Sequence, residues 1–149
     1  MSNDEKKRNF IYIDDKDFEI YQKLIKTHYF KGMKNIDLFL CATLVGLNVV
    51  KKSSSLAKSK RREYIRVNDN KNKESMIILK SVAISKFDDV NVLSDEDRLF
   101  SFCEDYANSG IKQLNVWYEN NEETFDNILT KELLKFWNEL DFKKIKDEN

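Results

Sequence analysis

The chain has 149 residues, of which 41% are hydrophobic and 35% charged, and its 26 basic side chains balance its 26 acidic ones. This length and apolar content suit one domain with a core of its own. The absence of proline and the presence of only three glycines exclude a turn-rich sandwich or barrel, and one histidine with two cysteines excludes the common zinc sites. We therefore expect a mainly helical single domain over residues 1–149, a bundle of about five helices with one or two short strands near the N-terminus and the middle.

The chain lacks the features of a membrane or exported protein. No run approaches the roughly 20 consecutive apolar residues of a membrane-spanning helix. Residues 1–9 are polar, with no apolar h-region of a signal peptide. We expect a cytoplasmic protein with no membrane association, frayed at residues 1–9 and 143–149.

The N-terminal elements are predicted as a strand followed by a helix. Residues 10–13 form a β-prone run that stops at two aspartates. A helix over residues 15–28 follows, since Phe18, Tyr21 and His28 recur at helical spacing. A homodimer paired through the strand is one solution, because a lone short strand needs a partner.

A second helix is predicted over residues 35–48, with a broad apolar stripe. Residues 51–62 then read as a mobile basic loop, because they include three consecutive serines and no apolar periodicity. Tyr64, Ile65 and Val67 indicate a short strand. Residues 73–86 fit an amphipathic or buried helix, although their β-branched content leaves a strand open.

The C-terminal half is predicted to hold two further helices. Ser94 and Asp97 resemble a capping box, so a helix should begin there and keep one apolar face to Tyr118, with Gly110 as a stop or hinge. A last helix is predicted over residues 122–142. Cys41 and Cys103 lie among apolar neighbours and should be reduced core residues.

Charge is distributed unevenly along the chain. Residues 1–75 carry 17 lysines and arginines against 10 acids, whereas residues 76–149 carry 9 against 16. Such asymmetry indicates an electropositive region and an anionic partner. Tyr64 is the one aromatic near the basic segment in sequence, which argues against a stacking platform for single strands. The candidate phosphate-binding residues are Lys51, Lys52, Lys58, Lys60, Arg61, Arg62 and Arg66.

The residues for catalysis are sparse. The three glycines are isolated, so no phosphate-cradling loop is present, and His28, the only imidazole, reads as a packing residue. The acidic clusters at residues 14–17, 88–89, 95–97 and 104–105 have ordinary explanations as helix starts and turns. We expect no enzyme activity and no cofactor or metal.

Three segments resemble a known family. MKNIDLFLCATLVGL at residues 33–47, FCEDYANSGIKQL at residues 102–114 and the opening IYIDDKDFEIYQKL are similar to the DNA phosphorothioation-associated protein 4 family, encoded beside bacterial DNA sulfur-modification and restriction genes. The resemblance implies an accessory role in a DNA modification or phage-defence locus, with no catalytic residue to transfer. The signature residues are Glu104, Tyr106, Ala107, Asn108 and Gly110, and Asn108 and Gly110 also read as helix-end residues.

Three functional interpretations follow. The first is a non-catalytic accessory factor of that system that binds DNA through the basic segment or binds a partner protein of the system. The second is an adaptor unrelated to DNA, which presents Trp117, Tyr118, Phe136 and Trp137 to a partner. The third is a metal-dependent nuclease that uses scattered acids such as Asp88 and Asp89.

Overall fold

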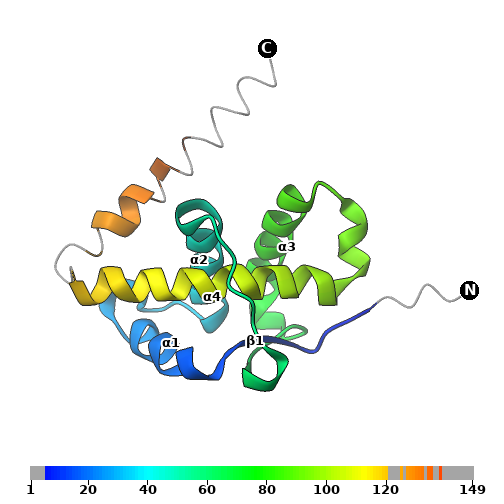
Figure 1. Cartoon of the computed structure of the whole chain (residues 1–149), viewed down its shortest axis with the longest axis horizontal. Coiled ribbons are helices and arrows are strands. Elements are labelled where there is room, and N and C mark those ends of the chain that lie inside the picture. The colour runs from blue at the N-terminus through cyan, green and yellow to red at the C-terminus, as the bar shows by residue number, and fades with distance from the viewer. Residues whose placement is uncertain (1–5, 121–124, 126, 133, 136–137, 139–149) are drawn as a thin grey trace, which may run out of the picture.

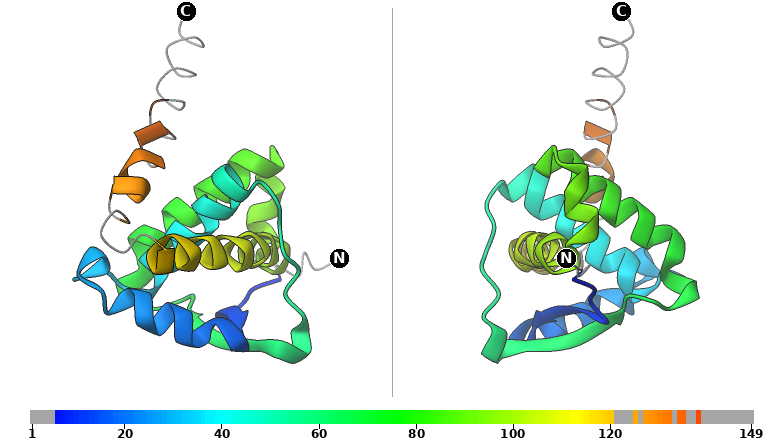
Figure 2. Two further views of the ribbon diagram at one scale, coloured as in Figure 1. Left: turned by 60° about the vertical axis from the view of Figure 1, so that its left-hand side comes forward. Right: turned by 90° about the vertical axis from the view of Figure 1, so that its right-hand side faces the viewer.

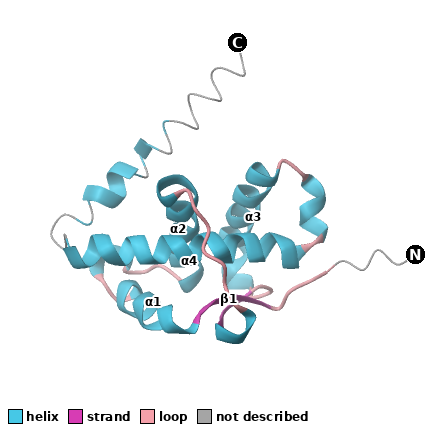
Figure 3. Ribbon diagram, viewed as in Figure 1, coloured by secondary structure: helices cyan, strands magenta, loops and turns pink. Residues whose placement is uncertain are grey.

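The computed structural model of the protein describes residues 6–120, 125, 127–132, 134–135 and 138. Its helices are α1 (Phe18–Ile25), α2 (Asn35–Val45), α3 (Lys73–Phe87) and α4 (Glu96–Asn120), and the described residues after position 124 are also helical. Two strands, β1 (Phe10–Asp14) and β2 (Arg61–Arg66), form an antiparallel ribbon. Figure 3 shows how small this strand content is beside the helices. The prediction of a mainly helical fold with one or two short strands is confirmed, and the described residues form two.

Helix α4 forms the centre of the fold, with the other elements packed around it (Figure 1). Its residues Leu99, Cys103, Ala107, Ile111 and Leu114 recur at intervals of three or four and are at most 1% exposed. This spacing puts them on one face of the helix, which therefore lies in the core. Cys103 is buried and Cys41 half-buried, and both are free thiols, as predicted.

Helices α2 and α4 cross at glycines. A Cβ atom on Gly110 would lie 1.7 Å from the carbonyl oxygen of Ala42, and one on Gly46 would lie 2.0 Å from that of Tyr106. Only a residue without a side chain allows the two backbones to approach this closely. The prediction that Gly110 stops or bends the helix is wrong, because α4 runs through it without a break.

The strand over residues 10–14 finds its partner within the chain. Ile11 pairs with Ile65, Asp14 pairs with Arg61, and a bulge lies between Ile11 and Tyr12. Ile11, Ile13 and Ile65 are at most 3% exposed and face the core. The argument for a homodimer through a lone strand therefore no longer holds, because β2 supplies the missing hydrogen bonds.

The helix predicted over residues 15–28 is shorter than expected. A 3-10 turn over Asp15–Asp17 precedes α1, which ends at Ile25, and a second 3-10 turn follows over His28–Phe30. Thr27 breaks the helix because its backbone is extended and its hydroxyl donates to the carbonyl of Leu24 at 2.6 Å. His28 is consequently exposed against the ring of Tyr29 rather than packed on an apolar helix face.

The other helix boundaries agree better with the sequence. Helix α2 begins at Asn35 and continues as a π-helix over Gly46–Val50. Residues 73–87 are helical rather than extended, which settles that alternative. Helix α4 begins where predicted, but Asp95 caps it by accepting from the Arg98 amide at 3.1 Å, whereas the Ser94 hydroxyl bonds to the preceding turn. The capping box of Ser94 and Asp97 is therefore wrong.

Candidate nucleic-acid interface

The basic segment folds into two connected parts. The first, called here the strap, comprises residues 51–60 and passes along the outer side of α4, from the end of the α2 continuation to β2 (Figure 2). The second is the ribbon of β1 and β2. Lys51 adopts a left-handed backbone with φ of 59°, which ends the helix and turns the chain into the strap.

Two side chains of α4 hold the strap. The Ser54 amide donates to the backbone carbonyl of Asp105 at 2.9 Å, and the Leu56 amide donates to the Asp105 carboxylate at 3.0 Å. The side-chain amide of Asn108 donates to the carbonyl of Ser54 at 3.1 Å. These bonds satisfy strap backbone groups that have no strand or helix partner, so the middle of the strap has a defined position against α4.

The predicted loop over residues 51–62 ends two residues early, because Arg61 and Arg62 already belong to β2. Pairing with β1 offers their backbone groups ladder hydrogen bonds that a loop lacks. The predicted mobility of the loop stays a prediction for residues 51–53 and 57–60, since hydrogen bonds to α4 hold Ser54 and Leu56.

The three arginines of β2 stack on aromatic rings. The guanidinium carbons of Arg61 and Arg62 lie 4.0 Å from the ring centres of Tyr12 and Phe18, and that of Arg66 lies 5.7 Å from the ring of Phe10. The side chains fall together because the strand register puts Tyr12 and Phe10 beside β2.

Tyr64 is the one aromatic near the basic segment in sequence, but the fold brings further rings against it. Residues more than 40 positions away supply the other rings. Since the arginines already cover those rings, the ribbon still offers no free platform for bases.

Most of the predicted phosphate-binding residues keep their charge available. All seven lie in the strap and β2, where Arg61 is half-buried and the other six are exposed. Arg62 forms an ion pair with Asp15 at 3.0 Å, and both side chains are largely exposed. Such a pair contributes little, about 0–1 kcal/mol. In the described part of the chain, the other six have no carboxylate partner within 4 Å.

Glu104 joins the ribbon to α4 through a buried ion pair. Arg8 donates to its two carboxylate oxygens at 2.8 and 2.7 Å, and the Tyr12 amide donates at 2.7 Å. Burial raises the pKa of Glu104 to about 7, although the Tyr12 amide and Arg8 both lower it. Arg8 was not among the predicted site residues. The only sequence signals for the pair are the position of Arg8 just before a β-prone run and the acid Glu104 in the signature.

The other signature residues also have structural roles. Gly110 lies where α2 crosses α4, Ala107 is buried in the core, and the ring of Tyr106 packs on Phe102 with their centres 4.9 Å apart. Asn108 accepts from Lys112 at 3.0 Å as well as holding the strap. The prediction that Asn108 and Gly110 are helix-end residues is wrong, because both lie in the interior of α4.

The acidic clusters do not combine into one site. No three His, Cys, Asp or Glu side chains gather as a metal-binding group among the residues with assigned positions. Asp17 pairs with Lys112 at 3.4 Å, Asp89 accepts from the Asn91 amide at 2.9 Å, and Asp105 holds the strap.

Burial raises the pKa of Cys41 to about 12, which leaves its thiol protonated near neutral pH.

The described residues define a class: a mainly helical protein whose basic segment is fastened across α4, the longest helix described, and carries on the outside six cations that have no carboxylate partner among these residues. The family model of DNA sulphur modification system-associated protein 4 matches residues 13–144, and the chain belongs to this family. It is therefore associated with a DNA sulphur modification system. Comparisons with curated proteins and with solved structures found no match. Within the described ranges, no helix is long and apolar enough to cross a membrane.

Proposed function

We propose that this protein is a non-catalytic accessory factor of a bacterial DNA sulphur modification and restriction system, and that it binds the phosphate backbone of DNA through the strap and β2. One observation carries the proposal: seven cations lie on one continuous segment, and six of them lack a carboxylate partner among the described residues. The family's association with DNA sulphur modification supports DNA as the anion.

The geometry of the segment suits a duplex. Phosphate contacts from lysine and arginine supply most sequence-independent affinity for DNA. The major groove also admits a two-stranded ribbon such as β1 and β2. Because the arginines are stacked on Tyr12, Phe18 and Phe10, they lose less side-chain freedom on binding than free side chains would.

Charge reversal in the strap tests the proposal without disturbing the core. Lys58 and Lys60 are exposed and have no carboxylate partner in the described part of the chain, so the double variant K58E/K60E should fold normally. Binding to a fluorescent duplex is measured between 50 and 200 mM salt. The plot of log affinity against log salt has a negative slope, and this slope should become less steep by about 2. Each phosphate that a lysine no longer neutralises reduces its steepness by about 0.9.

A matched control separates this effect from net charge. Lys26 and Lys86 are exposed lysines outside the basic segment, so K26E/K86E makes the same change in total charge. It should leave the slope within about 0.5 of that of the unchanged protein, because it removes none of the proposed phosphate contacts. Equal slopes for both double variants, or no measurable binding to any duplex, would refute a phosphate-binding strap. K60E/R61E/R62E extends the test into β2.

The proposal also states that the protein does not cleave DNA. Asp88 and Asp89 lie in the turn after α3, where Asp88 adopts a left-handed backbone with φ of 52°. Plasmid DNA incubated with magnesium should stay intact with the unchanged protein. Cleavage that disappears in D88N/D89N would establish the nuclease alternative.

A second candidate function, binding of a partner protein, is favoured by an apolar surface on α3. Ile77 and Ile78 are 58% and 50% exposed. The anchor predicted from Trp117 and Tyr118 is weaker, because both are half-buried against the core, and Phe136 and Trp137 lie outside the described residues. I77E/I78E should abolish capture of another protein of the same system while DNA binding is unchanged. Retained capture would exclude this surface.

A further inference from the structure

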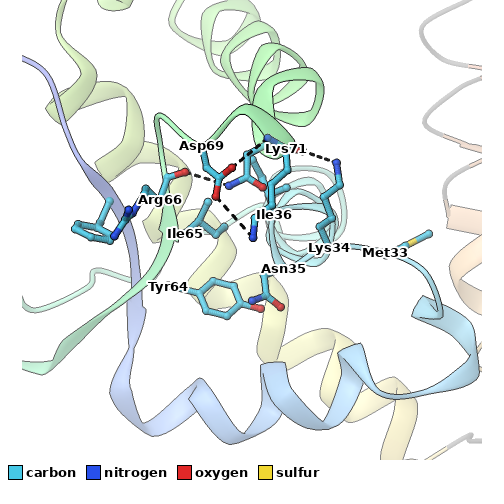
Figure 4. Close-up of a pocket in the computed structure, with 11 residues that line it drawn as sticks. Met33, Lys34, Asn35, Ile36, Tyr64, Ile65, Arg66, Asp69 and Lys71 are labelled. Atoms are coloured by element: carbon cyan, nitrogen blue, oxygen red, sulfur yellow. Dashed lines mark hydrogen bonds and ion pairs between the residues drawn. The ribbon is translucent and has the colours of Figure 1, made fainter.

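The ribbon has one face toward the core and one toward the outside. Ile11 and Ile65 are paired, buried and face the core. Successive side chains of a strand point to opposite faces, so the next residue of β1, Tyr12, faces outward together with its partner Glu63. Tyr64 is the extra residue of the bulge and lies on the same side of β2 as Ile65 (Figure 4). The outer face therefore carries an acid, Glu63, near its middle.

Two arginines lie on the same outer face, one on each side of Glu63. Arg61 is two residues before Glu63, and Arg66 follows the bulge and points away from the core-facing side of β2 (Figure 4). Both guanidinium groups lie over rings of β1, 4.0 Å from the centre of Tyr12 and 5.7 Å from that of Phe10. The outer face thus presents a cation, an acid and a second cation in order along β2.

These cations do not neutralise Glu63. Its side chain is exposed, and no basic group of the described residues lies within 4 Å of its carboxylate. Arg61 and Arg62 are its neighbours in sequence, but their guanidinium groups stack on Tyr12 and Phe18 instead. The carboxylate is therefore available to accept hydrogen bonds from a molecule outside the protein.

An acid in this position is unsuited to a surface that contacts phosphate alone. A carboxylate repels phosphate oxygens, so it lowers the affinity of the cations beside it for the DNA backbone. The major groove, by contrast, exposes donors as well as acceptors. The amino groups of cytosine and adenine donate hydrogen bonds there, whereas guanine O6 and thymine O4 accept them, and a glutamate pairs with cytosine N4. The chemistry of Glu63 thus fits a base edge rather than the backbone.

We propose that Glu63 reads a cytosine in the major groove, so that DNA binding depends on sequence. The inference rests on the proposed binding of DNA by the strap and β2. The carboxylate accepts a hydrogen bond from cytosine N4, while the cations on either side hold the ribbon against the duplex. Residues two apart on one strand face are separated by about 6.8 Å, the length of about two base steps. One side chain therefore addresses one base pair, and the preference concerns a single position.

The test begins with selection of duplexes bound by the full chain from a random pool, which should enrich one C·G pair. The selected duplex is then compared with a copy in which T·A replaces this pair, by fluorescence anisotropy. The copy should bind about tenfold more weakly, because thymine O4 meets the carboxylate with an acceptor. A third duplex with 7-deazaguanine opposite the cytosine should bind within twofold of the first, since it removes guanine N7 and keeps cytosine N4.

E63Q separates base readout from charge. Its amide both donates and accepts, so it no longer rejects thymine, and the affinity ratio of the first two duplexes should fall below threefold. A carboxylate that acts through charge alone leaves the ratio at about ten, because its removal raises both affinities equally. E74Q removes an exposed acid on α3 and should keep the ratio at about ten. Neither acid has an ion-pair partner among the described residues, so both variants should keep the melting temperature of the unchanged protein.

The outcomes distinguish this inference from the proposed function. A preference for C·G that E63Q removes and E74Q keeps supports readout by Glu63. Enrichment of an A·T pair, no enrichment at any position, tenfold weaker binding of the 7-deazaguanine duplex, or an unchanged ratio in E63Q overturns it. Binding to all duplexes alike, with the salt slopes expected for the strap, overturns this inference and leaves the phosphate-binding strap in place. No measurable binding to any duplex overturns both.

Discussion

The close crossing of α2 and α4 predicts a large cost for one added methyl group. In G110A the new Cβ atom would lie 1.7 Å from the carbonyl oxygen of Ala42, whereas such contacts are essentially never below 3.0 Å. The helices must therefore move apart by more than 1 Å. The obstacle is backbone, so no side-chain rotation can relieve it.

The magnitude follows from two opposing effects. Overpacking of a rigid core costs up to about 3 kcal/mol. Alanine regains about 1 kcal/mol of helix propensity over glycine. The net loss is about 2 kcal/mol, which lowers the melting temperature of a protein this size by about 4–8 °C.

Thermal unfolding followed by circular dichroism measures the effect, with G32A as the comparison. Gly32 has φ of +83° and nothing within 4 Å of its added Cβ, so its loss of about 1 kcal/mol or more comes from the left-handed backbone alone. Amide NMR signals of α2 should shift in G110A and stay in place in G32A. A melting temperature of G110A equal to or above that of the unchanged protein would show that the helices are not in backbone contact.

Three further predictions concern the ion pair, the strap and the end of α3. The pKa of Glu104 rises from 4.5 to about 7 on folding, so the folded state binds a proton that the unfolded state has lost, and the free energy of unfolding should fall as pH rises from about 4.5 to 7. Urea titrations at several pH values should show a weaker pH dependence of this free energy in E104Q. The same pH dependence in both proteins would mean that Arg8 keeps Glu104 ionised. N108A removes the bond to Ser54 and should cost about 1 kcal/mol, with faster hydrogen exchange at strap amides than in the unchanged protein; equal exchange rates would count against an anchoring role. D88G should raise stability by about 1 kcal/mol, because glycine adopts the left-handed C-terminal position of α3 without strain, and a lower melting temperature would contradict this.

Several features could be predicted from local patterns in the sequence. The spacing of Leu99, Cys103 and Leu114 predicts one buried face of a long helix, and the β-prone run at residues 10–13 predicts a strand. These patterns are readable because a helix or strand depends on neighbours within four residues. The clustering of basic residues and the family resemblance are also properties of the chain by itself.

The composition of the candidate site, by contrast, depended on residues far apart in the chain. Pairing of β1 with β2 puts Tyr12 under Arg61, and Asn108 holds Ser54 across 54 positions. Gly110 looked like a helix end because a local pattern cannot show that another backbone lies against it.

The sequence by itself thus determined the helical class, the basic segment and the family, since these depend on composition and short-range spacing. The tertiary structure alone decided that the segment forms a strap on α4 and continues into a ribbon, and that Glu63 lies between Arg61 and Arg66 on the outer face of that ribbon. The physical reason is that these contacts join segments far apart in the chain. Bringing such segments together costs chain entropy, and the packing of the whole core, not the residues next to each segment, offsets that cost.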